Sequence, residues 1–81
     1  MKTKNITYNN KELKLYVNGK NEFFFDDENI QTIFDLNRDK LRQIIDMNRE
    51  RLIESKEFIF DENTNRLWSK LGIIKLGFFT Q

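Results

Sequence analysis

Cysteine and histidine are both absent from this chain. Without cysteine it can form neither a disulfide framework nor a thiolate metal site. Without histidine it lacks the commonest general base and the commonest metal ligand in proteins. The usual groups of nucleophilic triads, zinc sites and histidine switches are therefore missing, and only carboxylate chemistry remains open. We expect neither an enzyme nor a bound cofactor or metal.

Long apolar runs are absent as well, since none approaches the roughly 20 residues that cross a bilayer. The N-terminal residues, MKTKNITYNN, are basic, but no apolar segment follows them as it would in a secretory signal. We therefore expect no membrane contact and a cytoplasmic location.

A strong excess of basic charge is the third absence. The net charge is only +1, although 33% of the 81 residues are charged. Because a domain that holds phosphates mainly by charge is usually far more basic, any nucleic-acid site must rest on a local cluster. Aromatic residues, by contrast, are abundant, with eight phenylalanines and an aromatic share of 14%. That share is enough to build the core of a single domain over residues 1–81.

Residues 11–25, KELKLYVNGKNEFFF, predict a β-hairpin, because apolar residues alternate on both sides of Asn18-Gly19. A two-residue loop at this point would mix apolar and charged side chains on one face. A three-residue loop with Gly19 left-handed pairs Tyr16 with Lys20 instead, and we prefer it. In this register one face of the hairpin holds Leu13, Leu15, Phe23 and Phe25.

Two helices are predicted after the hairpin. The dipeptide Asp26-Asp27 supplies an N-cap and a first-turn acid for a helix over residues 27–36. Asn37 is suited to a left-handed C-terminal position. A tight turn then leads to a second helix over residues 39–54, capped by Asp39.

A strand over residues 57–60, the polar turn DENTN and a second arm around Arg66–Trp68 predict a C-terminal hairpin. The last segment, LGIIKLGFFTQ, is compatible with a strand or with the start of a further helix. The order hairpin, helix, helix, hairpin is typical of winged-helix and helix-turn-helix modules. We therefore predict an α+β fold. It is a small winged-helix-like domain with an N-terminal β-hairpin, two helices, and a C-terminal β-hairpin or wing within residues 57–80.

Residues 38–51 hold five of the 14 basic residues of the chain. If the first turns of the second helix enter a major groove, basic side chains there hold phosphates, while Arg forks onto guanine and Gln onto adenine. The candidate nucleic-acid contacts are Arg38, Lys40, Arg42, Gln43, Arg49 and Arg51. A step of 100° per residue places Arg42 and Arg49 on one flank. The alternative is a solvated face whose charges pair along the helix, as Asp46 would with either arginine.

Three further features have structural interpretations. Asn48 falls on the apolar face of the second helix, where we interpret it as a buried amide that ties the helix to the following strand or hairpin. Trp68, Phe78 and Phe79 are interpreted as core residues or a dimer seam, with a partner-binding patch as the alternative. The acidic run Asp26–Asn29 looks superficially like a set of metal ligands, but a helix cap accounts for it.

The NRER of Asn48–Arg51, with Glu54 and the aromatic strand Phe58–Phe60, carries a resemblance that covers about residues 17–60. This segment resembles the N-terminal DNA-binding domains of phage antirepressors, the open-reading-frame-six and KilA-N-like group. That family has a short NG hairpin, a helix, and a second helix that ends in NRNRERF.EG before an aromatic strand. Ser55 stands here in place of the usual glycine, and IDMN in place of the more basic FNRN.

The resemblance implies a phage or mobile-element transcriptional regulator whose two-helix unit binds duplex DNA, with a homodimer as one assembly, in the cytoplasm of a host bacterial cell. The alternative function is a small phage protein that inhibits a host defence or regulatory protein, as an anti-CRISPR protein does, by protein–protein binding on the same scaffold. The low net charge and the acidic far side of the second helix favour this alternative.

Overall fold

The computed structural model describes all of residues 1–81 as an α+β fold with five strands and three α-helices. In chain order the elements are β1 (Lys2–Tyr8), β2 (Lys11–Val17), β3 (Phe23–Asp26), α1 (Asp27–Phe34), α2 (Arg38–Met47), the 3-10 helix η1 (Arg49–Arg51), β4 (Phe58–Phe60), β5 (Arg66–Trp68) and α3 (Lys70–Phe79). The strands form one antiparallel sheet in the order β1-β2-β3-β5-β4. The predicted α+β class is confirmed.

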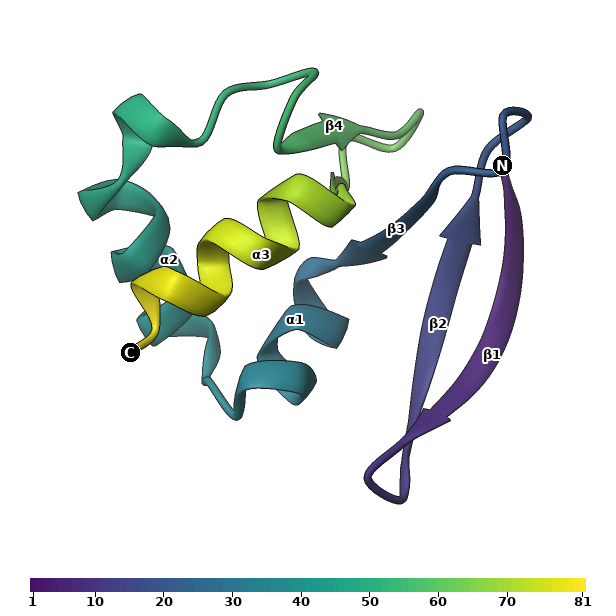
Figure 1. Ribbon diagram of the computed structural model, residues 1–81, viewed down its shortest axis with the longest axis horizontal. Helices are drawn as coiled ribbons and strands as arrows, with labels where there is room; N and C mark the ends of the chain where they lie inside the picture. The colour runs from purple at the N-terminus through teal and green to yellow at the C-terminus, as the bar shows by residue number, and fades with distance from the viewer.

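Strand β3 joins the two halves of the molecule. Its first residues pair with β2, whereas Phe25 and its neighbour pair with β5. Figure 1 shows the result, with the β1–β2 hairpin standing at one side and the helices gathered on the other. The side chain of Asn29 fastens the hairpin to α1, because it accepts from the Lys14 amide and donates to the Lys14 carbonyl, each at 3.0 Å.

The turn between β2 and β3 differs from the predicted three-residue loop. It spans residues 18–22 and pairs Tyr16 with Phe24 rather than with Lys20. The cause is the Asn18 side chain, whose oxygen accepts hydrogen bonds from the amides of Lys20 and Glu22 at 2.9 Å each. A longer loop organised by this one side chain therefore replaces the predicted glycine turn.

The left-handed residue of this turn is Asn21, with φ of 61°, and not Gly19. Leu13, Leu15, Phe23 and Phe25 still lie on one face of the sheet, as predicted. The reason is that the observed and predicted registers differ by an even number of residues. Burial does not follow the same division, since Phe24 is buried whereas Phe23 is 48% exposed at the start of β3.

Helix α1 begins where the sequence predicts, since the Asp26 carboxylate accepts a hydrogen bond from the Asn29 amide at 2.9 Å. The acidic run therefore caps a helix, as we interpreted it from the sequence. The helix ends at Phe34, short of the predicted end at residue 36, because Asp35 is left-handed with φ of 54°.

The start of α2 differs from the prediction in its cap. Asn37 accepts a hydrogen bond from the Lys40 amide at 2.7 Å and is the N-cap, so it is not the left-handed end of the preceding helix. Asp39, the predicted cap, lies in the first turn of α2. There its charge interacts favourably with the helix dipole.

The predicted helix over residues 39–54 is wrong at its C-terminal end, because α2 stops at Met47. Asn48 is the C-cap, and its side-chain amide donates to the Ile44 carbonyl at 2.8 Å. Asn48 is thus a structural amide, as expected, but it is half-buried rather than buried, and it binds its own helix rather than the next strand or the hairpin. The 3-10 helix η1 and an extended segment follow.

The C-terminal hairpin forms from β4 and β5 where it was predicted, with the DENTN turn between them. The last segment is α3, which begins where the Ser69 hydroxyl accepts from the Gly72 amide at 3.2 Å. The predicted strand and wing region, 57–80, is therefore a short hairpin followed by a helix. None of the helices is both long enough and apolar enough to cross a membrane.

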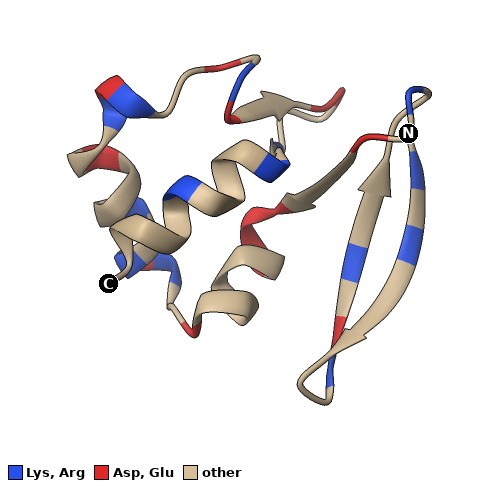
Figure 2. Ribbon diagram, in the orientation of Figure 1, with Lys and Arg blue, Asp and Glu red and all other residues tan.

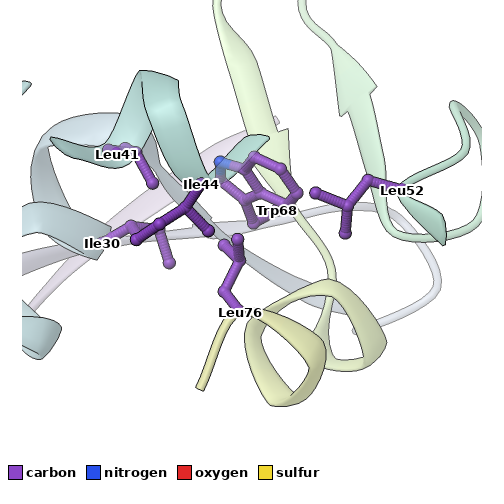
Figure 3. Packing of buried hydrophobic residues seen from close by; sticks show 6 residues of the cluster. All are labelled: Ile30, Leu41, Ile44, Leu52, Trp68 and Leu76. Atoms are coloured by element: carbon purple, nitrogen blue, oxygen red, sulfur yellow. The ribbon is translucent and has the colours of Figure 1, made fainter. Parts of the chain in front are cut away.

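The core lies between the helices and the β4–β5 hairpin, with Trp68 fully buried at its centre. Figure 3 shows this ring between Ile44 of α2 and Leu52, with Leu76 of α3 beneath it. The buried cluster consists of Ile30, Leu41, Ile44, Leu52, Trp68 and Leu76. Trp68 is thus a core residue, as interpreted from the sequence, and Phe79 packs against the same cluster.

Candidate nucleic-acid interface

Four of the six predicted contacts lie on α2, and their side chains are exposed. Because an α-helix turns 100° per residue, Arg38 and Arg42 share one flank of α2, whereas Lys40 lies on the other flank. Gln43 lies on the outer face, beside Asp46. On α2 the fold therefore places Arg38 and Arg42 together and separates Lys40 from them.

The two remaining predicted contacts, Arg49 and Arg51, lie on η1 beyond the end of α2. Arg42 and Arg49 do not share one helical flank as predicted, because α2 ends between them. Arg49 pairs with Asp46 at 3.0 Å, and this leaves Arg42 without an acidic partner. In Figure 2 basic and acidic segments alternate along α2 and η1, so the positive charge is local and not a continuous stripe.

A small pocket, here called the arginine pocket, lies between α1, α2 and β5. Its volume is about 160 Å3, and its lining residues are Asp27, Gln31, Arg38, Leu41, Arg42, Ile45 and Arg66. Three of these side chains carry a guanidinium group and one carries a carboxylate. The pocket therefore has an excess of positive charge and of hydrogen-bond donors.

Arg66 is the member of the arginine pocket that the sequence did not reveal. Its guanidinium carbon lies 5.6 Å from the ring centroid of Phe58 and 5.5 Å from that of Trp68. Its Nη2 lies 3.5 Å from Oδ2 of Asp27, and its buried Nε has no hydrogen-bond partner. Asp27 is also engaged elsewhere, since its Oδ1 accepts from the Trp68 indole at 2.7 Å.

A buried carboxylate, Glu57, connects the segment after η1 to α3. This residue is only 1% exposed, and its carboxylate accepts from the Lys75 ammonium and, at 3.1 Å, from the Ile53 amide. Its carbonyl accepts from the Ser69 amide and hydroxyl at 2.9 and 3.0 Å. Burial raises the pKa of Glu57, but the hydrogen bonds and the charge of Lys75 outweigh burial and hold that pKa below its ordinary value.

The outer face of α3 is apolar and exposed. Leu71, Ile74 and Phe78 recur at the spacing of one helical face, and Phe78 is 67% exposed. Beside it lies a hollow of about 640 Å3 with Ile53 and Phe79 among its apolar lining residues. Phe78 is therefore not a core residue of this chain. A helix that is apolar on all sides is normally buried, so this face is suited to contact with another protein surface.

Chemically, the arginine pocket and the outer side of α2 offer cationic and amide donors. The pocket lining contains no hydroxyl group, and its one carboxylate is held by an arginine and an indole. This set of side chains is suited to binding an anion. No protein family, curated protein or solved structure matches this chain, so its function is argued from the geometry.

Proposed function

We propose that this chain is a DNA-binding domain of a phage or mobile-element transcriptional regulator, with α1 and α2 as its contact unit. The observation that carries the proposal is that Arg38, Lys40 and Arg42 are exposed on α2 without an acidic partner. Basic side chains in this state neutralise DNA phosphates and release counterions. The alternative of charges paired along the helix applies to Arg49 but not to these three.

The connection between the two helices also supports the proposal. It spans residues 35–37, and a turn of three or four residues is typical of helix-turn-helix units, whose second helix enters the major groove. On such a helix Arg42 and Gln43 suit guanine and adenine edges, respectively. The β4–β5 hairpin that follows would then serve as the wing of a winged-helix-like domain.

The proposal predicts that Arg38→Gln combined with Arg42→Gln weakens binding to duplex DNA about a hundredfold, since each of the two arginines loses a charge-assisted contact worth about tenfold. The slope of log K against log salt concentration should also become shallower by about two, one for each lost phosphate contact. Fluorescence anisotropy of a labelled duplex, measured over a series of salt concentrations, gives both quantities.

The matched control is Lys2→Gln combined with Lys4→Gln, which removes the same charge from exposed residues of β1 on the far side of the molecule. This variant should bind almost as the unaltered protein does. Equal affinity and equal salt slope for the α2 variant and the unaltered protein would contradict the proposal.

The exposed face of α3 favours a second candidate function, the binding of a host protein by a small phage inhibitor. The apolar side chains Leu71, Ile74 and Phe78 offer the contact area that such binding needs. Under this function, Ile74→Ser combined with Phe78→Ser should abolish capture of one discrete host protein in a pull-down, whereas Arg38→Gln with Arg42→Gln should not. This second candidate would be rejected if the unaltered protein captures no host protein and the α3 variant still binds duplex DNA in a salt-dependent manner.

A further inference from the structure

The arginine pocket contains more positive charge than its own acid neutralises. Its lining holds three guanidinium groups, from Arg38, Arg42 and Arg66, against the single carboxylate of Asp27. The contact between Arg66 and Asp27 is 3.5 Å long, beyond the usual length of a charge-assisted hydrogen bond. Two positive charges therefore remain without a partner around one small volume.

Arg66 is held in place before any ligand arrives. The rings of Phe58 and Trp68 lie within 6 Å of its guanidinium carbon, and its side chain is only 27% exposed. Its Nε is buried and has no hydrogen-bond partner, a state that costs free energy. A fixed guanidinium loses little conformational freedom when it binds an oxyanion, because its fork of donors is already ordered.

Acids also approach Arg66 from its other side, where Asp26, Asp27 and Glu28 line a neighbouring hollow. Arg66 alone would therefore not distinguish an anion site from an internal ion-pair network. The distinction comes from Arg38 and Arg42, which form no ion pair and line the same pocket. Arg38 and Arg42 on α2 have no ion pair, and Arg66 on β5 has an Nε without a hydrogen-bond partner. All three line one pocket, whose volume is suited to one small oxyanion.

We infer that the arginine pocket binds a phosphate group, whose oxygens accept hydrogen bonds from Arg38, Arg42 and Arg66. Guanidinium groups match phosphate in charge and in planar, bidentate geometry. The group has two sources, the backbone of a nucleic acid or a free phosphate ion. With the backbone as source, the inference rests on the proposed function and makes β5, as well as α2, part of the DNA contact.

Trp68 is the only tryptophan of the chain, and its indole N–H donates to Asp27 inside the pocket lining. Its single indole resonance in a proton–nitrogen NMR spectrum therefore reports on the pocket. Sodium phosphate should shift this resonance in a saturable manner, whereas sodium chloride at equal ionic strength should not. Arg42→Gln, an exposed substitution, should weaken the phosphate response about tenfold, and Arg66→Lys should do so through loss of the planar fork.

Lys4→Gln is the control, because it removes one charge from exposed strand β1, outside both the pocket and the proposed DNA contacts, and should leave the phosphate response unchanged. If phosphate and duplex both shift the indole resonance and both weaken in Arg42→Gln, the inference holds with DNA as source. If phosphate shifts it but no duplex binds, the pocket takes free phosphate and the proposed function fails. If duplex binds while neither ligand moves the resonance, the pocket inference is overturned and the proposed function stands. If neither ligand binds, both are overturned.

Discussion

Gly72→Ala is expected to be the most destabilising of the single substitutions proposed for this protein. A Cβ at this position would overlap the carbonyl oxygen of Glu57 and lie 2.8 Å from its carbonyl carbon and 2.9 Å from Cε3 of Trp68. Neither neighbour can move easily, because the Glu57 carbonyl accepts two hydrogen bonds from Ser69 and Trp68 is fully buried. We expect a loss of about 3 kcal/mol or more, against a total of about 4–12 kcal/mol for a domain of this length.

Urea denaturation followed by circular dichroism measures this loss, and the other two glycines provide controls. A Cβ at Gly77 would meet Phe34 at 3.5 Å, an ordinary van der Waals contact, and nothing lies within 4 Å of one at Gly19. Gly77→Ala should therefore be neutral or stabilising by up to about 1 kcal/mol, since alanine favours a helix. A Gly72→Ala protein that unfolds at the same urea concentration as the unaltered protein would show that α3 does not pack on Glu57 as described.

Lys75→Met is expected to destabilise the protein by about 3 kcal/mol. The substitution leaves the carboxylate of Glu57 buried with only the Ile53 amide as a hydrogen-bond donor, and an uncompensated buried charge is costly. We choose the lower end of the usual range because the Lys75 side chain is itself 35% exposed and partly screened by water. The double variant Glu57→Gln with Lys75→Met should recover part of the loss, since it removes both charges.

The pH dependence of this pair has a definite sign. Because the folded state holds the pKa of Glu57 below its ordinary value of 4.5, the pair stabilises the protein above that pH. This stabilisation is lost as the pH falls through the lowered pKa and the folded carboxylate becomes protonated. In Lys75→Met burial acts without the ammonium, so the free energy of unfolding should instead decrease as the pH rises from 4 to 7.

The surface pair of Arg49 and Asp46 is the control for the buried one. Its side chains are 78% and 51% exposed, and exposed pairs of this kind contribute little. Arg49→Met should therefore change the free energy of unfolding by less than about 0.5 kcal/mol at any pH. If Lys75→Met has an equally small effect, Glu57 is not buried with Lys75 as its partner.

Elements with a local chemical signal could be predicted from the sequence. The N-cap of α1 is an aspartate followed by an apolar stripe, and both features act within a few residues. The β4–β5 turn is equally local, because Asp61 accepts hydrogen bonds from the amides of Asn63 and Asn65 at 2.9 and 2.8 Å. The signal for strand β1 was weak, limited to Ile6 and Tyr8, since nearly all of its residues are exposed.

The end of α2 could not be predicted from the spacing of apolar residues. A buried residue at helical spacing can lie on the helix itself or on an extended segment that follows it. Leu52 is buried and continues the apolar periodicity of α2, which favoured a helix to residue 54. In the structure Leu52 reaches the core from an extended segment with φ of −115°. Periodicity records that a side chain is buried, but not whether the backbone that delivers it is helical.

The candidate site was predictable only in part for a related reason. Arg38 and Arg42 are one turn apart on α2, so the helical spacing alone places them together. Arg66 joins them because the sheet brings β5 against β3 and the start of α1, a long-range contact with no trace in the local sequence. The ion pair between Arg49 and Asp46 joins residues three positions apart and was one of the two alternatives that the sequence left open.

Strand β1 has a consequence for how copies of this protein behave in a crowded cell. It lies at the edge of the sheet, and its outer row of backbone N–H and C=O groups has no strand beside it. Such edges recruit other strands and seed fibrous aggregates. Here Lys2 and Lys4 carry like charges along the open edge, and the opposite edge, β4, has only three residues. The chain is thereby protected at both ends of its sheet against edge-to-edge aggregation.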